Sequence, residues 1–233
     1  MPVAPHPLDN PARSSLTGPH ARFAQRRGEV LRYPADVCPF YGLPDEPTAA
    51  DWADAAAFAG PGGVLGLAAV RVPPPDGWAV EFAGEGMQMT GAGVGGAGDP
   101  EVVPLGPGDV PQMLDLAGRT RPGPFLPRTV EMGGYLGIRR DGELVAMAGE
   151  RLHPPGWTEI SAVCTDPAWR GRGFGSRLIL AACAQITARG ETPFLHVLAA
   201  NVNAIRLYEQ LGFGLRKSTV FTAARVPAVQ HTP

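Results

Sequence analysis

Residues 165–177 combine a glycine-rich turn with the expected start of a helix. Glycine lets the backbone approach a ligand closely, and successive N–H groups in such a turn can point toward one place. A helix N-terminus adds a partial positive charge, so a segment of this kind can bind a pyrophosphate without a lysine. Arg170, Arg172 and Arg177 add positive charge. The segment therefore predicts an anion site.

Spacing separates this interpretation from other glycine-rich sites. A dinucleotide fingerprint requires GxGxxG, whereas Gly171, Gly173 and Gly175 are spaced GxGxG. A P-loop is excluded because no Gly-Lys-Ser/Thr follows. A plain glycine turn with solvated arginines is the remaining alternative, and the further features described below disfavour it.

The segment resembles the acetyl-CoA loop of the GNAT superfamily of N-acetyltransferases, whose pattern is Arg/Gln-x-x-Gly-x-Gly/Ala. Arg170 to Gly175 match this pattern, and the resemblance extends over 160–167 and 201–213. It covers about residues 100–225 and implies acetyl-CoA as co-substrate, with no metal. By the resemblance, one strand pairs with the pantetheine arm, the turn holds the pyrophosphate and an asparagine lies beside the arm. The implied cofactor-binding residues are Val163, Cys164, Thr165, Arg170, Gly171, Arg172, Gly173, Phe174, Gly175, Ser176, Asn201 and Tyr208.

Acetyl transfer from a thioester to an amine requires a neutral nucleophile, an oxygen that can carry transient negative charge and a proton for the departing thiolate. By the resemblance, Tyr208 stands at the position of the family's general-acid tyrosine, in the pattern Ala-x-x-Leu-Tyr-Glu. A core aromatic residue is the structural alternative. The amide of Cys164 is expected to polarise the thioester carbonyl, which leaves its thiol as a small apolar group. Direct attack without a covalent enzyme intermediate follows.

Glu159 and His196 are the candidates for the base. Glu159 precedes Arg170 by eleven residues, as does the glutamate that serves as base in the histone-modifying branch of the family. A solvent-exposed carboxylate at a strand edge is the alternative. His196 stands where the branch that acetylates protein N-termini carries a glutamate, which disfavours that acceptor. A histidine can relay a proton near neutral pH, and a hydrogen-bonded structural histidine is the alternative.

The elements that must position these residues follow from periodicity and turn signals. Asp141-Gly142 is a two-residue hairpin turn and 154–156 turns the chain again, so three antiparallel strands precede the glycine segment. An apolar stripe at helical spacing follows the segment and ends at Gly190. The elements expected in the second half are strand 101–105, helix 109–117, strands 135–139, 143–152 and 157–165, helix 173–189, strand 194–198, a helix between 201 and 212, and strand 220–226.

The first half carries weaker signals. It predicts a helix at 48–59 and a hairpin of two apolar runs, 64–72 and 78–82, joined by a proline-rich turn. Residues 91–100 are rich in glycine and have too few side chains to build a core, so they predict a linker or long loop at a domain boundary. The predicted organisation is an N-terminal α/β region at 1–95, a catalytic domain at 96–228 and a tail at 229–233.

Two roles stay open for the first half, which has no second RGxG loop and so predicts no second cofactor site. It is either a degenerate GNAT-like half, as in glycine N-acyltransferase-like members, or a cap on the substrate side. The fold class implied by the resemblance is α+β (α/β). It is a GNAT fold, with a mixed, mostly antiparallel central sheet flanked by helices and a smaller degenerate α/β N-terminal domain.

Length and composition place the chain among ordinary soluble proteins, because its 233 residues are 44% hydrophobic and 18% charged. A net charge of -2 disfavours nucleic-acid partners. The three cysteines lie far apart, which favours neither disulfides nor zinc. With no signal peptide and no apolar run near the ~20 residues of a membrane span, the expected location is the cytoplasm, without a membrane partner.

The expected function is therefore that of an acyltransferase, an N-acetyltransferase that acts on a primary amine, either a small molecule or a peptide. A homodimer is compatible with this expectation. The alternative from another class is a non-catalytic acyl-CoA-binding sensor or scaffold. RNA binding through the Arg-Gly segment is a further alternative, which the near-neutral charge disfavours.

Overall fold

The computed structural model describes residues 5–228, so the tail expected at 229–233 lies outside the described residues. The helices are α1 (Pro11–Leu16), α2 (Ala49–Ala59), α3 (Val110–Thr120), α4 (Phe174–Ala188) and α5 (Val202–Gln210). The strands are β1 (Gln25–Arg27), β2 (Val30–Arg32), β3 (Tyr41–Gly42), β4 (Val64–Ala68), β5 (Ala79–Thr90), β6 (Val103–Leu105), β7 (Tyr135–Arg140), β8 (Glu143–Glu150), β9 (Trp157–Thr165), β10 (Thr192–Leu198) and β11 (Gly214–Arg225). Short 3-10 turns are η1 (Pro7–Asp9), η2 (Ala21–Phe23), η3 (Pro107–Asp109), η4 (Thr129–Met132) and η5 (Pro167–Trp169).

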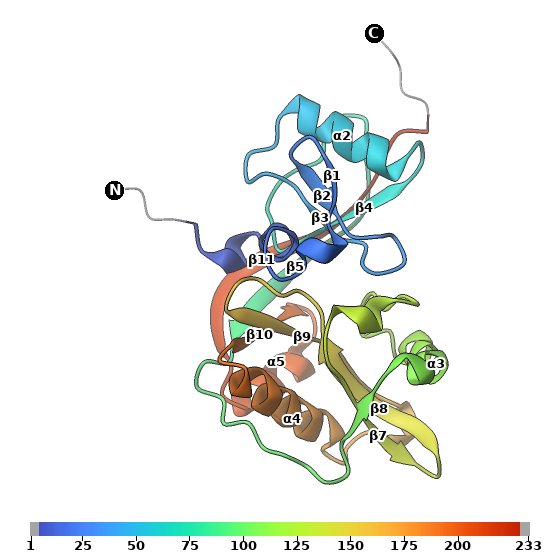
Figure 1. Ribbon diagram of the computed structural model, residues 1–233, viewed down its shortest axis with the longest axis vertical. Coiled ribbons are helices and arrows are strands. Elements are labelled where there is room, and N and C mark those ends of the chain that lie inside the picture. The colour runs from blue at the N-terminus through green and yellow to red at the C-terminus, as the bar shows by residue number, and fades with distance from the viewer. Residues whose placement is uncertain (1–4, 229–233) are drawn as a thin grey trace.

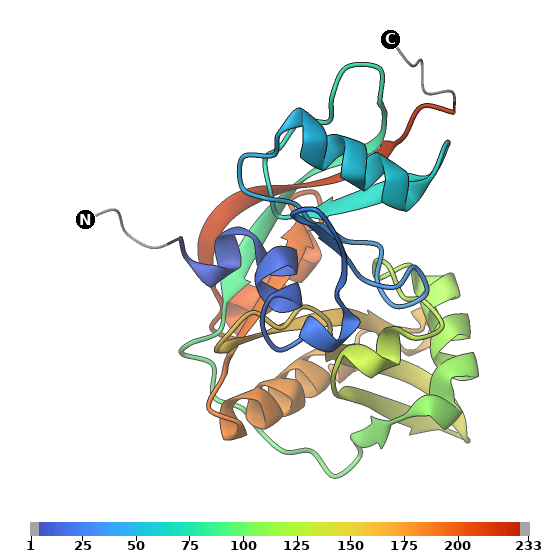
Figure 2. The ribbon, with the colours of Figure 1, turned by 45° about the horizontal axis from the view of Figure 1, so that its top comes forward.

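One eight-stranded sheet organises the molecule, in the order β4-β11-β5-β10-β9-β8-β7-β6. Its β9 and β10 pair in parallel, and its other neighbours are antiparallel. Helices flank the sheet, as Figures 1 and 2 show. The predicted α+β fold with a mixed, mostly antiparallel sheet is confirmed.

The helices next to the glycine segment cover opposite faces of this sheet. Alternate residues of a strand point to opposite faces, and on β8 Met147 packs with α3 while Ala146 packs with α4. The α4 stripe of Leu178, Ala182 and Ile186 is buried against Ile160 and Leu195, among others. The predicted helix 173–189 is therefore confirmed within one residue at each end, and its burial fixes the start of α4 beside β9.

The predicted hairpin of 64–72 and 78–82 is wrong. β11 lies between β4 and β5 and pairs antiparallel with both. β11 also begins six residues before the predicted start of the final strand. In Figure 1, β5 and β11 run together from the lower part of the molecule to its top. A proline-rich turn in the sequence indicates that the chain reverses direction. It does not indicate whether the two strands that it joins pair with each other or with other strands.

The glycine-rich segment 91–102 is a strap that packs along α4, and not a free linker. The amide of Ala97 donates to the Leu180 carbonyl at 3.1 Å, and the Val94 side chain of the strap is buried in the core. A side chain on Gly96 would clash with the backbone of Ala184, so the missing side chains allow close contact. The same sheet includes β4 and β5, which precede the strap in the chain, and β6 to β11, which follow it. The boundary near residue 95 stays a prediction.

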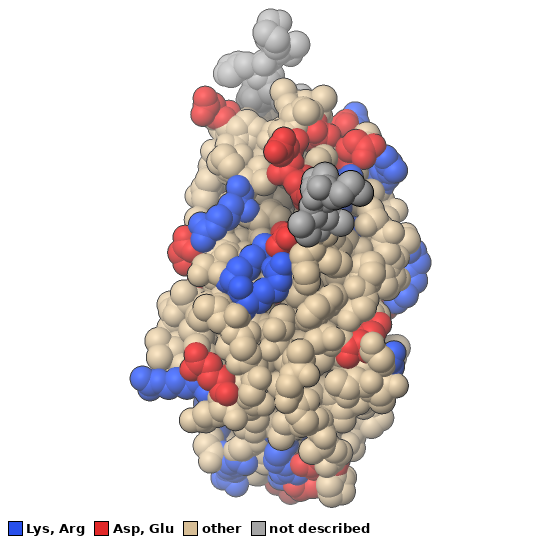
Figure 3. Space-filling view, turned by 90° about the vertical axis from the view of Figure 1, so that its left-hand side faces the viewer, with Lys and Arg blue, Asp and Glu red and all other residues tan. Residues whose placement is uncertain are grey.

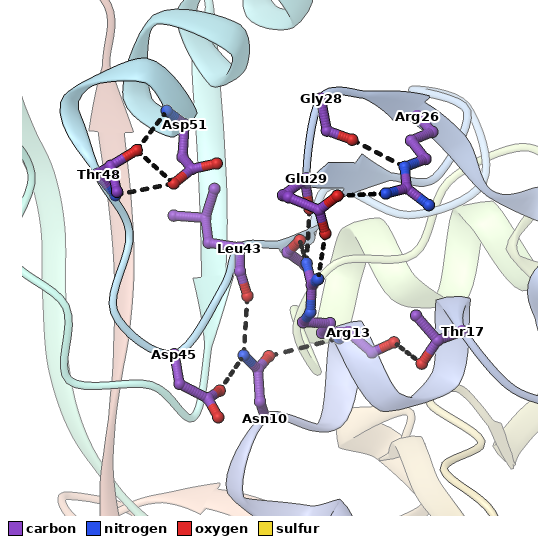
Figure 4. Close-up of polar contacts among 11 residues, drawn as sticks. Asn10, Arg13, Thr17, Arg26, Gly28, Glu29, Leu43, Asp45, Thr48 and Asp51 are labelled. Atoms are coloured by element: carbon purple, nitrogen blue, oxygen red, sulfur yellow. Dashed lines mark hydrogen bonds and ion pairs between the residues drawn. The ribbon is translucent and has the colours of Figure 1, made fainter.

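Residues 5 to about 45 form a layer over the sheet face opposite α4. Asn10 ties this layer together by donating to the Leu43 carbonyl at 2.9 Å and to Asp45 at 2.8 Å, while its own oxygen accepts from the Arg13 amide (Figure 4). Leu8, Tyr33 and other buried residues of the layer pack against Phe194 of β10. This layer therefore encloses the side chains on that face of β9 and β10.

The surface carries charges of both signs in small groups. Figure 3 shows blue and red side chains scattered over a face that is mostly neither. None of the helices within residues 5–228 is long and apolar enough to cross a membrane.

Candidate active site

The glycine segment forms a turn that requires glycine at two positions. Gly171 and Gly173 have φ values of 76° and 75°, in the left-handed region that residues with a Cβ rarely adopt. Asp166 begins the turn by accepting from the Ala168 amide at 2.9 Å. Gly173 is the N-cap residue of α4. The two glycines thus bring the chain from β9 into α4 within eight residues.

The first turn of α4 has no side-chain cap. Its leading amides belong to Phe174, Gly175 and Ser176, and the turn before it, Gly171 to Gly173, is exposed. Uncapped amides at the positive end of a helix of fifteen residues form an anion site of the kind that phosphates occupy. The predicted pyrophosphate residues therefore lie together at this helix end.

The three arginines of the segment differ in their contacts. Arg172 stacks over the Trp169 ring at 4.6 Å, and Arg170 donates to the Thr165 carbonyl at 3.3 Å. Arg177 instead forms a bidentate pair with Asp99 at 2.5 and 2.7 Å and also reaches Glu101. Its charge is thus balanced, and Arg170 and Arg172 supply the positive charge beside the turn.

A fork opens between β9 and β10 in front of the turn. The two strands pair from Trp157↔Thr192 to Ile160↔Leu195 and then diverge. On its other side, β9 bulges: the three steps from Ser161 to Cys164 lie opposite two steps of β8. Ala162 has a φ of 53° within this bulge. Beyond Ile160 the β9 edge that faces β10 is therefore without a strand partner, and Val163, Cys164 and Thr165 lie on that segment.

α5 packs Tyr208 against the part of β10 that borders the fork. The Tyr208 side chain shares a buried cluster with Phe174 of α4 and with Leu195 and Val197 of β10. Burial raises the pKa of its phenol to about 12, so the hydroxyl stays protonated at physiological pH. Asn201 is the exposed N-cap of α5, and its side-chain oxygen accepts from the Ala204 amide at 3.2 Å.

Glu159 and His196 meet on the face covered by the N-terminal layer. The His196 Nδ1 atom lies 2.6 Å from Glu159 Oε1, and the two side chains are 1% and 0% exposed. Arg151 donates twice to the same carboxylate, at 2.9 and 2.6 Å, and the Leu152 amide donates at 3.2 Å. Burial raises the pKa of Glu159, but the Arg151 guanidinium outweighs burial and holds that pKa well below its usual range.

Gln88 of β5 fixes the tautomer of His196. Its Nε2 donates to the Leu8 carbonyl at 2.8 Å and lies 3.0 Å from His196 Nε2, while its Oε1 accepts from Arg216 at 2.7 Å. His196 Nε2 therefore accepts a hydrogen bond, and its Nδ1 donates to Glu159. The His196 ring is thus held by hydrogen bonds at both nitrogens.

Sequence reasoning missed Arg151 and Gln88. Arg151 could have been found, because Arg151 and Glu159 flank the turn at 154–156 and lie opposite each other in the hairpin, where the Arg151 amide donates to the Glu159 carbonyl at 3.0 Å. Nothing in the sequence pairs Gln88 with His196, because β5 comes from a distant part of the chain. Among residues 5–228 no group of three or more potential metal ligands occurs.

Comparison with known proteins gives a family match and several relatives. The family model described as FR47-like protein matches residues 135–222. A solved structure of a GNAT-family protein from Novosphingobium aromaticivorans is 40% identical to this chain, with a TM-score of 0.87. That similarity covers 94% of this chain and 98% of the other, so it includes the first half as well as the second.

Two curated relatives match the chain over shorter spans. N-alpha-acetyltransferase RimI of Mycobacterium tuberculosis is 40% identical over 36% of this chain, which is 55% of its own length. A mycothiol acetyltransferase of Acidimicrobium ferrooxidans is 33% identical over 41% of this chain and 32% of its own length. The chain therefore spans about half of the first relative and about a third of the second.

Proposed function

Because the chain belongs to the GNAT family of acetyltransferases, we propose that it transfers an acetyl group from acetyl-CoA to an amine. The uncapped start of α4 behind two left-handed glycines is the single observation that carries this proposal. The pyrophosphate of acetyl-CoA binds the amides of Gly171 to Ser176, with Arg170 and Arg172 beside it. The pantetheine arm lies along the β9 edge from Val163 to Thr165, in the fork, and passes Asn201.

The reaction proceeds by direct attack. The amine nitrogen attacks the thioester carbonyl carbon, and an amide on the free edge of β9 donates to the carbonyl oxygen as it becomes negative. Cys164 lies opposite Met147 of β8, and the Asp166 amide donates to Val145 of the same strand. By alternation along β9, the Cys164 amide therefore faces β8, and the amides of Val163 and Thr165 face the fork. The C–S bond then breaks and CoA departs. The Cys164 thiol supports this route, because burial raises its pKa and its side chain packs in the cluster beneath α3. A thiol that stays protonated is a poor nucleophile.

Tyr208 gives its proton to the departing CoA thiolate. A phenol with a pKa of about 12 is protonated at working pH, and the thiolate needs one proton to leave as a thiol. Tyr208 belongs to the cluster that includes Leu195, the residue at which the pairing of β10 with β9 ends. Its position therefore suits a donor at the sulfur end of the cofactor.

For the base, the contacts favour His196 over Glu159. The Glu159 oxygens already accept from Arg151, Leu152 and His196, and its lowered pKa makes it a weak proton acceptor. The lone pair of His196 Nε2 accepts from one donor, Gln88, and the amine must displace this donor to reach it. We assign His196 as the group that takes the amine proton and Glu159 as the carboxylate that orients it.

A non-catalytic acyl-CoA-binding protein is the second candidate, and the burial of His196 and Glu159 favours it. It predicts binding of acetyl-CoA without release of CoA in the presence of any amine. The names of the two curated relatives indicate different acceptors, so the acceptor is assigned here only as an amine.

The test combines calorimetry with a CoA-release assay across a panel of amines. We expect saturable binding of acetyl-CoA and CoA, and no binding of NAD. Replacing the general acid by Tyr208→Phe should lower kcat by about 100-fold or more while the Kd for acetyl-CoA stays unchanged. Tyr41→Phe, in the N-terminal layer, is the matched control. Folded protein that fails to bind acetyl-CoA would overturn the proposal.

A further inference from the structure

Two large apolar side chains meet on the surface where β5 passes the end of β10. Phe82 is 46% exposed and Leu198 is 41% exposed. A Cβ built on Gly84 would lie 2.6 Å from the Phe82 ring and 3.1 Å from the Leu198 side chain. Both side chains therefore cover the bare backbone of Gly84, and they approach the same point from different strands.

Phe221 of β11 continues this apolar surface inward. It pairs opposite Gly84, and its ring lies 3.1 Å from the position of a Cβ on Gly86. The ring centroids of Phe221 and His196 are 5.3 Å apart, with the planes nearly perpendicular. Because both glycines lack side chains, the aromatic rings lie directly on the strand. Phe82, Leu198 and Phe221 are called the apolar shelf below.

The apolar shelf borders the fork through Leu198 of β10. Leu198 is the last residue of β10, three residues beyond Leu195, where pairing with β9 stops. The inner end of the shelf contacts His196, to which the proposed function assigns the amine proton. The shelf thus runs from exposed side chains at the surface to the buried ring of His196.

The carboxylates of β5 near the apolar shelf in the sequence form ion pairs. On the same strand as Phe82, Glu85 pairs with Arg71 at 3.0 Å and Glu81 pairs with Arg225 at 2.5 Å. The charges of both carboxylates are balanced at the surface. The interaction that the shelf itself offers a ligand is therefore the burial of apolar surface.

We propose that the apolar shelf binds an apolar or aromatic group that the acceptor carries beside its reactive amine. The proposal rests on the proposed function and narrows the acceptor class. Clustered apolar side chains on a surface mark binding sites more often than scattered ones do. Phe82 and Phe221 are rigid rings, which lose little conformational freedom when they pack against a ligand.

The experiment compares 2-phenylethylamine with ethylamine, which carries the same reactive group without the ring. Two readouts are taken: kcat/KM from CoA release, and the Kd of each amine for the protein saturated with CoA. We expect both readouts to favour 2-phenylethylamine by about 10-fold or more. Phe82→Ala should reduce this preference to less than half, and Leu198→Ala should reduce it as well. Leu215→Ala, at an exposed position near the start of β11, is the control and should leave it unchanged.

Each remaining outcome has a definite meaning. If both amines are acetylated equally well, or if the preference for 2-phenylethylamine persists in both variants, then the proposed role of the shelf is wrong. The proposed acetyltransferase activity would still stand. If the protein binds 2-phenylethylamine more tightly than ethylamine but no amine causes release of CoA, then the binding role of the shelf is supported. The proposed acetyltransferase activity would then be wrong. If sedimentation shows a dimer that Phe82→Ala converts to monomer, the shelf is an interface between two copies and the proposal is wrong.

Discussion

At the scale of single residues, buried charge decides which groups can exchange protons. Glu159 is fully buried against Arg151, and the two charges compensate each other. Removing one partner of such a pair costs about 3–5 kcal/mol, because the other charge stays buried. The same contacts that stabilise the carboxylate remove it from proton transfer. Its role in the proposed chemistry is therefore to hold the Nδ1 proton of His196.

His20 makes the stability of the fold dependent on pH. Its Nε2 donates to the Met132 carbonyl at 2.9 Å, its Nδ1 lies 3.1 Å from the Tyr33 hydroxyl, and burial lowers its pKa from 6.5 to about 4. The unfolded chain thus binds the proton at higher pH than the folded chain does. His20 makes its full contribution to the free energy of unfolding above pH 6.5. This contribution is lost as the pH drops to 4, and it amounts to at most about 3 kcal/mol.

Urea unfolding at pH 7 and at pH 4.5 measures this contribution. His20→Phe should lower stability at pH 7 through the lost hydrogen bonds, but its stability should change less between the two pH values than that of the unmodified protein. Tyr33→Phe keeps the histidine and should retain most of the pH dependence. Equal pH dependence in the His20→Phe variant and the unmodified protein would contradict the assignment.

At the scale of elements, the sequence predicts what depends on neighbours along the chain. The glycine turn, α4 and α5 were predictable because glycine conformation and helical periodicity are local. The position of β11 between β4 and β5 was not, because strand pairing depends on contacts between distant segments. The same limit applies at the site: Tyr208 follows from a local pattern, whereas the Gln88 contact with His196 joins two strands that only the fold brings together.

The strap of residues 91–102 offers a matched pair of glycines. A Cβ on Gly96 would clash with the backbone of Ala184 in α4, whereas nothing lies within 4 Å of a Cβ on Gly98. Gly96→Ala should therefore lift the strap and lower the free energy of unfolding by about 1–3 kcal/mol. Gly98→Ala should be neutral or slightly stabilising, because alanine restricts the unfolded chain. Thermal unfolding of both variants is the measurement, and equal effects would show that the strap does not pack on α4.

At the scale of the whole molecule, the first half completes the structure of the second. β5 lies between β10 and β11 and supplies hydrogen bonds to both, and the N-terminal layer covers Glu159 and His196 through Leu8 and its neighbours. Figure 2 shows the N-terminal segment lying across the strands that carry these residues. The site proposed for the acceptor thus uses residues from both halves, with Phe82 and Gln88 on β5.

This arrangement predicts that the second half does not fold by itself. A fragment of residues 96–228 lacks β5, so β10 and β11 would each expose an unpaired edge and the buried Arg151–Glu159 pair would lose its cover. We expect the fragment to show no cooperative thermal transition by circular dichroism and no binding of acetyl-CoA. Co-expression with residues 1–95 should restore both, because β5 can then pair between its two neighbours. If the fragment alone unfolds cooperatively and binds acetyl-CoA, then the boundary near residue 95 separates independent folding units and β5 is dispensable to the cofactor site.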